Sequence, residues 1–479
     1  MKSRLSLLLL IISLFCSTLM AQEKFKATWN SLEKYELPEW IKDAKFGIFI
    51  HWGLYSVPGF ESEWYPRNMY DKESAVFKHH VDTYGKHDQF GYKDFIPMFK
   101  AEKFDATSWV DLFKKAGARY IVPVAEHHDG FAMYKSSLTK WNAFDMGPHR
   151  DIVGEIAAAT KKAGLVFGLS SHRIEHWWFF NHGKTFNSDV LDPKYADFYG
   201  PAHEENETMS PEYMNDWLLR NVELVEKYQP QLFWFDWWIE QPVLEPYRKS
   251  FASYYYNKGL EWNKGVAINF KNQSFPGHSA MLDIERGKLT EIRKETWQTD
   301  DALGYKSWGY IRDNTFKSEK YIINNLIDIV SKNGVLLLNI GPKPDGTITD
   351  EETRVLLAVG DWLKVNGEAI YETRPWKTFG EGPTNVAGGS FSDDKDKPFT
   401  ADDVRYTTRA GKLYAISLDQ PIKPIVCKKL NIDAGGIQSV EMVGSSQHIT
   451  WKQDKNGLTI QPSSEYPSKH AVSYRIQMK

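Results

Sequence analysis

The sequence predicts an α/β protein in which an N-terminal (β/α)8-like barrel is followed by a C-terminal antiparallel β-sandwich. From about residue 40, short apolar runs alternate with amphipathic helical stretches, and several runs are apolar throughout, as in parallel strands buried on both faces. After about residue 371 the segments become short and alternate between polar and apolar residues, which is typical of an antiparallel domain. We therefore expect the barrel to span residues 22–370 and the β domain residues 371–479.

The barrel elements follow one another in a regular order. The expected strands are residues 45–51, 120–125, 165–170, 232–236, 266–270 and 335–340, and the expected helices are residues 108–116, 151–163, 210–228, 318–331 and 350–365. The helix at 210–228 has the clearest start, because Ser210 can cap it and Pro211 suits its first position. This alternation favours a (β/α) barrel in which loops replace some of the helices.

The C-terminal part begins with a long connection. Residues 380–397 are rich in Gly, Pro, Asp and Ser, which predicts a surface loop. Strands are expected at 404–408 and 413–417, and a second hairpin joins 449–453 to 458–461 through the turn Asn456-Gly457.

The first 21 residues have the pattern of a signal peptide. Lys2 and Arg4 precede an apolar run at residues 5–14, and Ala21 is the small residue expected before a cleavage site. The run is shorter than the ~20 residues that a transmembrane helix needs. Cleavage would leave one cysteine, Cys427, and therefore no intramolecular disulfide. We expect a periplasmic or secreted protein without a membrane span, and the pattern leaves homo-oligomer formation open.

The composition disfavours some classes of function. Lys and Arg total 59 against 62 Asp and Glu, a net charge of −3, and no long basic run is present, which argues against a nucleic-acid-binding protein. The chain contains 18 Trp, 24 Tyr and 27 Phe, which can provide rigid apolar faces for stacking on sugars or bases or can simply fill a core.

Polar and titratable residues gather where the apolar strands end. These residues are His51, Glu126, His127, His128, Asp129, Ser171, His172, Asp236 and Asn269. In a (β/α) barrel the C-terminal ends of the strands meet on one face, where the active site lies. The sequence therefore predicts one polar pocket on that face.

Asp236 is the most informative of these residues. It lies in a run with five aromatic neighbours, Phe233 to Trp238, where a carboxylate is costly unless it has partners or a function. A nucleophile or general base beneath a stacked sugar fits this setting. A glycosidase also needs a second carboxyl group in a different environment. Spacing alone does not choose among the candidates Glu240, Glu245, Glu285, Glu291 and Glu295.

The histidines also permit a metal-dependent barrel hydrolase. However, His127 and His128 would point to opposite faces of a regular strand, so both could bind one ion only in an irregular turn. His172 and His176 could serve together if they were helical. Neutral imidazoles that hydrogen-bond to substrate hydroxyls explain His51, His127 and His128 equally well. We expect no metal and no cofactor.

Several motifs resemble those of the α-L-fucosidases, glycoside hydrolase family 29, in the same order along the chain. They are His51-Trp52-Gly53 with Tyr55 to Pro58, Glu63-Trp64-Tyr65, Glu126 to Phe131, Phe233 to Asp236, Asp283 to Gly287, Ser307 to Tyr310, and Asn333 to Pro342 with Asp345-Gly346. The match spans about residues 29–376 and continues into the β domain.

The resemblance implies a retaining exo-hydrolase that acts on terminal α-L-fucose in glycans. It assigns Asp236 as the nucleophile and Glu285 as the acid/base, the latter in a variable region. The residues that it places around the sugar are His51, Glu63, Trp64, His127, His128 and Trp234. We also assign Trp308, which lies in one of the matching motifs, to the substrate site. Trp64 or Trp234 would pack on the C6 methyl group.

Two departures from the family pattern concern sugar specificity. His172 stands near a position where relatives often have Tyr, and Lys271 takes the place of an Arg. We assign both to the sugar site, and they keep an α-L-galactosidase open as an alternative. A carbohydrate-binding protein with an inactive site is disfavoured, because both candidate carboxylates are present.

Overall fold

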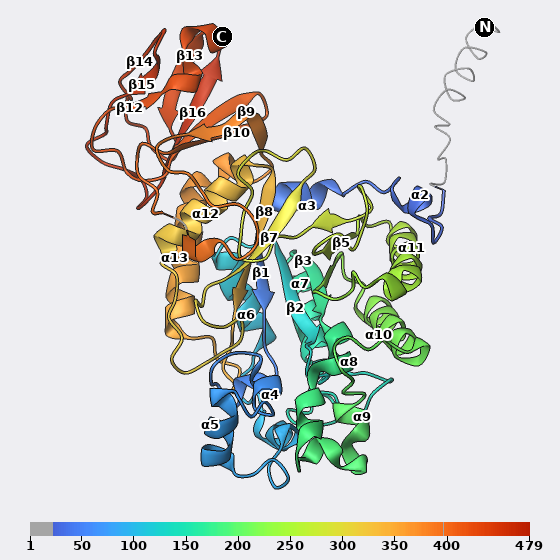
Figure 1. Ribbon diagram of the computed structural model, residues 1–479. Coiled ribbons are helices and arrows are strands. Elements are labelled where there is room, and N and C mark those ends of the chain that lie inside the picture. The colour runs from blue at the N-terminus through green and yellow to red at the C-terminus, as the bar shows by residue number, and fades with distance from the viewer. Residues whose placement is uncertain (1–22, 396) are drawn as a thin grey trace, which may run out of the picture.

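The centre of the computed structural model, which describes residues 23–395 and 397–479, is a sheet of eight parallel strands (Figure 1). They are β1 (Phe46–Ile50), β2 (Tyr120–Glu126), β3 (Val166–Ser171), β4 (Leu232–Phe235), β5 (Ala267–Phe270), β6 (Met281–Leu282), β7 (Trp297–Ala302) and β8 (Gly334–Ile340), in the spatial order β6-β5-β4-β3-β2-β1-β8-β7. Ile284 N donates to Gln298 O at 2.9 Å, which joins the segment after β6 to β7. The sheet therefore closes into the predicted barrel.

Helices cover the outside of the barrel and fill its long connections. They are α2 (Trp29–Leu32), α3 (Glu39–Ala44), α4 (Tyr65–Asn68), α5 (Ala75–Tyr84), α6 (Ala106–Lys115), α7 (Ile152–Lys162), α8 (His176–Phe179), α9 (Ala196–Tyr199), α10 (Pro211–Tyr228), α11 (Glu245–Glu261), α12 (Glu319–Ser331) and α13 (Asp350–Asn366). No α-helix is described within 271–280 or 283–296, the segments around β6. These two segments carry Lys271 and Glu285.

Side-chain caps explain where the helices begin. Ser210 accepts a hydrogen bond from Tyr213 N at the start of α10, and Pro211 occupies the first position, as predicted. Helix α6 begins at Ala106, two residues before the predicted start, because Asp105 caps it by accepting from Ser108 N at 2.6 Å.

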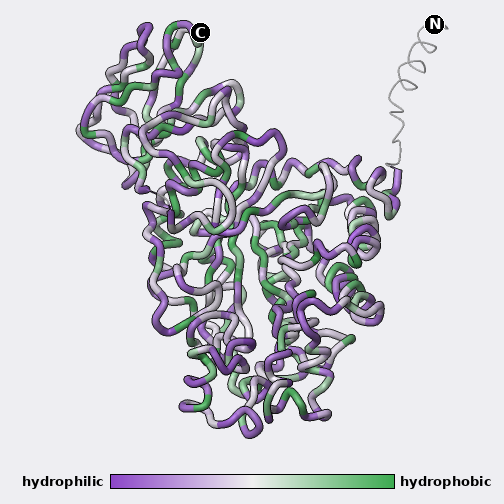
Figure 2. Tube along the Cα trace, in the orientation of Figure 1, coloured by the Kyte–Doolittle hydropathy of each residue, from purple (hydrophilic) through white to green (hydrophobic). Residues whose placement is uncertain are grey.

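The inside of the barrel is filled by alternate residues of the strands. Phe49, Val122, Trp234 and Leu337 belong to one buried cluster there. Gly47 leaves room for the ring of Tyr120, since a Cβ at Gly47 would lie 2.4 Å from it. Figure 2 shows the central strands mainly in the apolar colour, in agreement with the continuous apolar runs of the sequence.

The C-terminal unit consists of two antiparallel sheets with a buried apolar core. The strands are β9 (Arg374–Glu381), β10 (Val404–Arg409), β11 (Lys412–Ser417), β12 (Ile425–Cys427), β13 (Ile437–Met442), β14 (Trp451–Asp454), β15 (Gly457–Ile460) and β16 (Val472–Met478). Their order is β13-β16-β11-β10-β9 in one sheet and β12-β15-β14 in the other. The predicted sandwich is confirmed, and its strands β9 and β10 pack against α12 of the barrel (Figure 1).

The connection from β9 to β10 differs from the prediction. We name residues 382–395 the connecting loop. Instead of lying only on the surface, it pairs with the barrel, because Gly389 N donates to Lys288 O at 2.9 Å and Phe391 N donates to Glu285 O at 2.9 Å.

The N-terminal prediction concerns residues that the structure does not describe. The expected signal peptide, residues 1–21, lies outside the described residues. Among the residues that are described, no helix has the length and apolar character needed to cross a bilayer. The division between residues 370 and 371 stays a prediction.

Candidate active site

A cavity of about 590 Å³ opens at the C-terminal ends of the barrel strands. The predicted site residues that line it are His51, Glu63, Trp64, His127, His128, His172, Trp234, Asp236, Lys271, Glu285 and Trp308. All of the predicted site residues are therefore in one place. They come from segments spread over more than half of the chain, and the closed barrel brings them together.

Other polar residues at the strand ends have different surroundings. Glu126 binds Arg173 Nη1 at 2.6 Å, and Asp129 accepts a hydrogen bond from Tyr92 Oη at 2.7 Å. Neither of them, nor Ser171 or Asn269, is among the lining residues of the cavity.

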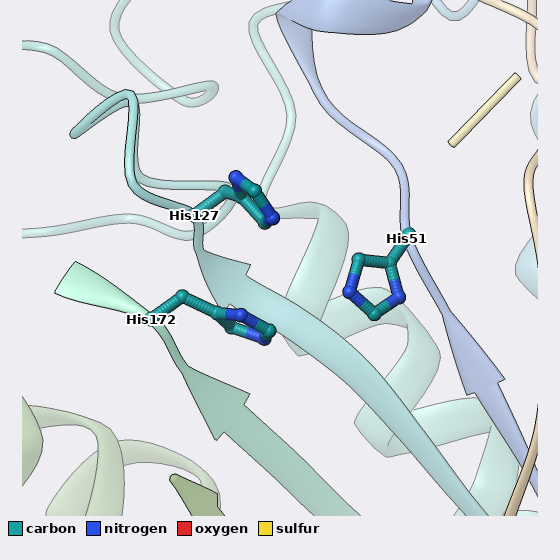
Figure 3. Close-up of side chains that lie close together, drawn as sticks. All are labelled: His51, His127 and His172. Atoms are coloured by element: carbon teal, nitrogen blue, oxygen red, sulfur yellow. The ribbon is translucent and has the colours of Figure 1, made fainter. Parts of the chain in front are cut away.

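Three of the lining histidines, His51, His127 and His172, follow neighbouring strands and lie close together (Figure 3). The ring centroid of His172 lies 5.3 Å from that of His51 and 4.9 Å from that of His127. His51 Nδ1 is 2.7 Å from Asn339 Oδ1, an amide oxygen that can only accept, so Nδ1 carries the proton. Burial lowers the pKa of His51 and of His127 well below the usual range, and both rings are neutral at pH 7.

His127 and His128 both line the cavity, contrary to the expectation that they would point to opposite faces. The reason is that β2 ends at Glu126, so both histidines lie in a turn. His128 Nδ1 is 2.9 Å from His172 O, and burial lowers the pKa of His128 to about 4.

Asp236 follows β4 directly and is 7% exposed. Its Oδ2 lies 2.8 Å from His172 Nδ1, and its Oδ1 lies 3.3 Å from Lys271 Nζ. Burial opposes ionisation, but the Lys271 ammonium and His172 together hold the pKa of Asp236 well below its usual range. Asp236 is thus a carboxylate at neutral pH.

Glu285 shares this lysine with Asp236. Lys271 Nζ lies 2.6 Å from Glu285 Oε2, and Trp237 Nε1 donates to the same oxygen at 2.6 Å. Asp300, on β7, lies 3.3 Å from Lys271 Nζ. Lys271 is therefore a buried cation shared by three carboxyl groups.

Glu63 and Trp64 also line the cavity. Glu63 Oε2 accepts from Ser307 Oγ and from Trp308 N, each at 2.9 Å. Burial raises the pKa of Glu63 despite these hydrogen bonds. Trp64 is half-buried and packs against His128 and Phe179, so it offers an apolar surface to the cavity.

The other candidate acid/base residues lie elsewhere. Glu240 binds Asn272 Nδ2 at 3.0 Å, and Glu245 is on helix α11. Glu291 is exposed, and Glu295 lines a separate cavity. Of the five glutamates considered, Glu285 is the one that lines the cavity with Asp236.

Among the residues that the structure describes, two groups of side chains could hold a metal ion, namely His51, His127 and His172, and His128, His172 and Asp236. Within each group the ligand atoms lie within 4.8 Å of one another. His176, considered from sequence spacing, instead places Nδ1 2.9 Å from His128 O. The same imidazoles can equally bind sugar hydroxyls.

Sequence reasoning missed several lining residues. They are Glu61, Ser62, Trp237, Arg286, Asp300, Tyr305, Lys306, Phe391 and Asp393. Trp237 could have been found, since it follows Asp236 directly. Asp300 could have been suspected from the pair of acidic residues at 300–301, had that segment been identified as a strand.

Two family models match most of the chain. The model described as Alpha-L-fucosidase matches residues 12–368, and the model described as Alpha-L-fucosidase C-terminal domain matches residues 396–478. The chain belongs to the α-L-fucosidase family. This membership confirms the resemblance seen in the sequence, and the chain is accordingly an enzyme, a glycoside hydrolase.

Relatives and solved structures agree with this family. The chain is 32% identical to tissue alpha-L-fucosidase of Homo sapiens over 486 residues, 98% of this chain and 96% of the relative. It is 32% identical to the Rattus norvegicus enzyme over 445 residues, 91% of this chain and 87% of the relative. The crystal structure of Thermotoga maritima alpha-fucosidase in complex with fucose superposes with a TM-score of 0.76 at 31% identity and covers 94% of this chain and 100% of that chain.

Proposed function

We propose that this enzyme is a retaining exo-α-L-fucosidase that releases terminal α-L-fucosyl residues from glycans. The observation that carries the proposal is the pair formed by Asp236 and Glu285. Lys271 Nζ lies 3.3 Å from Asp236 Oδ1 and 2.6 Å from Glu285 Oε2, so the separation of these two oxygens cannot exceed the sum of the two distances. That limit is compatible with the separation of about 5–5.5 Å between the two carboxyl groups of retaining enzymes.

In the first step, Asp236 attacks C1 of the sugar while Glu285 gives a proton to the leaving oxygen. The C1–oxygen bond breaks, and a β-fucosyl ester forms on Asp236. Both donors to Glu285 bind Oε2, so we assign the transferred proton to Oε1. In the second step, Glu285 takes a proton from water, and the water oxygen attacks C1. The ester bond between C1 and Asp236 breaks, which restores the carboxylate and releases fucose with net retention.

The remaining side chains suit the sugar. Neutral imidazoles of His51 and His127 can donate to or accept from hydroxyl groups, and Glu63 adds a further carboxyl group. Trp64 offers an apolar face for the C6 methyl group, whereas one face of Trp234 is occupied by Lys271 Nζ, 4.6 Å from the ring centroid. The fucose complex of the Thermotoga maritima relative supports this choice of sugar.

We place the enzyme in the periplasm or outside the cell, where glycans are accessible. This placement rests on the sequence pattern of residues 1–21. Detection of the mature protein with an N-terminus at Gln22 would test it directly.

A substrate screen tests the activity. Aryl α-L-fucoside, α-L-galactoside and β-D-galactoside are compared with and without a chelator. We expect the fucoside to be preferred over the α-L-galactoside by about 10–200-fold, since a hydroxymethyl group gains little in an apolar slot. Equal or better turnover of the α-L-galactoside would assign the enzyme to that sugar, with Lys271 and His172 as the residues to exchange. Loss of activity in chelator would favour the metal-dependent alternative.

Proton NMR tests the stereochemistry. During early hydrolysis, α-fucose should appear before mutarotation produces the β anomer. Initial appearance of the β anomer would contradict the retaining mechanism.

A further inference from the structure

The connecting loop is built into the barrel beside Glu285. Phe391 N donates to Glu285 O at 2.9 Å, and Ser392 N donates to Arg286 O at 3.0 Å. Lys288 and Gly389 form an antiparallel bridge. The two backbones approach so closely that a Cβ at Gly287 would lie 2.0 Å from Gly389 O. A segment that leaves the C-terminal sheet thus forms part of the wall next to the candidate acid/base.

A buried ion cluster fixes this loop. The Asp393 carboxylate binds Arg286 Nη2 at 2.8 Å and Lys317 Nζ at 2.7 Å. Lys317 is fully buried, and it also binds Asp301 at the end of β7. The ion pairs connect the loop to the barrel and hold the residues before Asp393 in a defined position.

Phe391 has two unfavourable features that packing does not explain. Its side chain is 49% exposed, although it lines the cavity. Its backbone has a φ of 52°, in the left-handed region that bulky residues rarely adopt. Strained residues of this kind tend to be retained at functional sites.

The ring of Phe391 is oriented by Trp237. The two rings are nearly parallel, with an interplanar angle of 10° and centroids 6.1 Å apart, within the range of offset stacking. Trp237 is itself fixed by its hydrogen bond to Glu285 Oε2. Together they present a rigid aromatic surface at the mouth of the cavity.

We propose that Trp237 and Phe391 form the subsite that binds the leaving group of the substrate, and that this leaving group is a neutral pyranose. The inference rests on the proposed function. A general acid must come within about 2.6–3.2 Å of the leaving oxygen. Side chains that contact Glu285 on the outer side of the cavity therefore lie beside the leaving group. The C–H face of a pyranose is apolar and flat enough to pack on such a surface.

The charges at the mouth favour a neutral sugar over an anionic one. Among the described residues that line the cavity, Arg286 is paired with Asp393, and Lys306 is paired with Asp313 at 2.8 Å. Lys271 is shared by Asp236, Glu285 and Asp300. A sulfate or carboxylate on the leaving sugar would have to displace one of these partners.

Specificity constants for two substrates test the subsite. An α-L-fucosyl-β-D-galactoside disaccharide contains the pyranose leaving group, whereas α-L-fucosyl fluoride has nothing to stack on the aromatic surface. For Phe391→Ala, the ratio of kcat/KM for the disaccharide to kcat/KM for the fluoride should fall about tenfold, equivalent to about 1.4 kcal/mol. Phe391→Tyr keeps the ring and should restore the ratio. Phe144→Ala removes another phenylalanine, 36% exposed and outside the cavity lining, and should leave the ratio unchanged.

An unchanged ratio in Phe391→Ala would overturn the proposal. Equal losses on both substrates would also overturn it, since the contribution of Phe391 would then not depend on the leaving group. If Phe391→Ala does not fold, Phe391→Leu carries the test, because it keeps apolar bulk without a flat ring and should still lower the ratio. Failure of the unmodified enzyme to hydrolyse either substrate would refute the proposed function, and the subsite with it.

Discussion

Lys271 Nζ lies 2.6 Å from Glu285 Oε2, so a buried ammonium contacts the candidate acid/base directly. The carboxyl groups of Asp236 and Asp300 lie 3.3 Å from the same nitrogen. Burial disfavours the ammonium, but these carboxyl groups raise the pKa of Lys271 well above its usual range. Burial also raises the pKa of Asp300 well above its usual range.

Replacement of Lys271 should change the pH dependence of the reaction. Lys271 lowers the pKa of Asp236, so Lys271→Gln should raise it, and the nucleophile would be protonated at a higher pH. We expect the acidic limb of kcat/KM against pH to move upward by about one unit or more, with each unit equal to about 1.4 kcal/mol. Lys271→Arg, which keeps the charge, is the control. An acidic limb that stays in place in Lys271→Gln would show that the ammonium does not set the ionisation of the nucleophile.

Removal of the nucleophile should abolish turnover of every substrate. Without the Asp236 carboxylate no covalent intermediate forms, and Asp236→Gly should lose activity on the order of 10⁴-fold or more. Azide can enter the vacated space and attack C1 from the β side, so it should restore part of the activity and give β-fucosyl azide. NMR of the product identifies the anomer. Formation of the α azide would place the nucleophile elsewhere.

Removal of the acid/base should have a different signature. Glu285→Ala should still form the glycosyl-enzyme from a substrate with a good leaving group, which needs little protonation, and a burst of aglycone should appear. Azide replaces the activated water and should give the α azide. Glu291→Ala is the matched control and should behave like the unmodified enzyme. If Glu291→Ala gave the burst and Glu285→Ala did not, the segment 283–296 would be assigned wrongly, while Asp236 would keep its role.

The parts of the barrel that could be predicted are those with a local signal. Strand β8 is apolar except for Asn339, and helix α10 has both Ser210 and Pro211 at its start. Strands β6 and β7 could not be found in this way. Strand β6 has only two residues, and β7 carries the polar residues 298–301, which face buried partners such as Tyr120 Oη, 3.0 Å from Gln298 Oε1.

The residues of the candidate site likewise include some that could be predicted from a local sequence signal and others that could not. Asp236 and His51 could be found because they follow apolar strands directly. Lys271 and Glu285 lie in segments without a described α-helix and were identified only through the family resemblance. Phe391 and Asp393 could not be predicted, because Asp393 is 107 residues from its partner Arg286 and the pairing is a tertiary contact.

Acidification should destabilise the fold through buried histidines. His80 is fully buried, with Nδ1 2.9 Å from Tyr65 Oη and Nε2 2.8 Å from Phe90 O, and burial lowers its pKa from 6.5 to about 4. Between these two values the unfolded chain binds more protons than the folded one, so stability falls as the pH falls, by up to about 1.4 kcal/mol per pH unit for this group.

The measurement is the difference in Tm between pH 7 and pH 5. His80→Gln removes the titrating group, and we expect it to reduce this difference, even though it lowers Tm at both pH values by disturbing the two hydrogen bonds. His448→Gln alters an exposed histidine and serves as the control. The same difference in Tm in His80→Gln and in the unmodified protein would rule out His80 as a source of acid sensitivity.

The barrel and the C-terminal domain are joined by a buried ion cluster. Asp328 on α12 binds Lys332 Nζ at 2.6 Å and Arg405 Nε of β10 at 2.6 Å. The carboxylate and Lys332 are fully buried, and Arg405 is almost so. Burial opposes ionisation of Asp328, but the two cations hold its pKa well below the usual range.

Asp328→Asn should destabilise the protein by about 3–5 kcal/mol, because it leaves two buried cations without their counter-charge. Thermal unfolding should show a lower Tm, whereas Asp361→Asn, on the exposed face of α13, should change stability by no more than about 0.5 kcal/mol. The double variant Asp328→Asn with Arg405→Met removes one of the stranded cations, so its loss should be smaller than the sum of the two single losses. If the losses of the single variants simply add, Asp328 and Arg405 do not stabilise the domain junction as a pair.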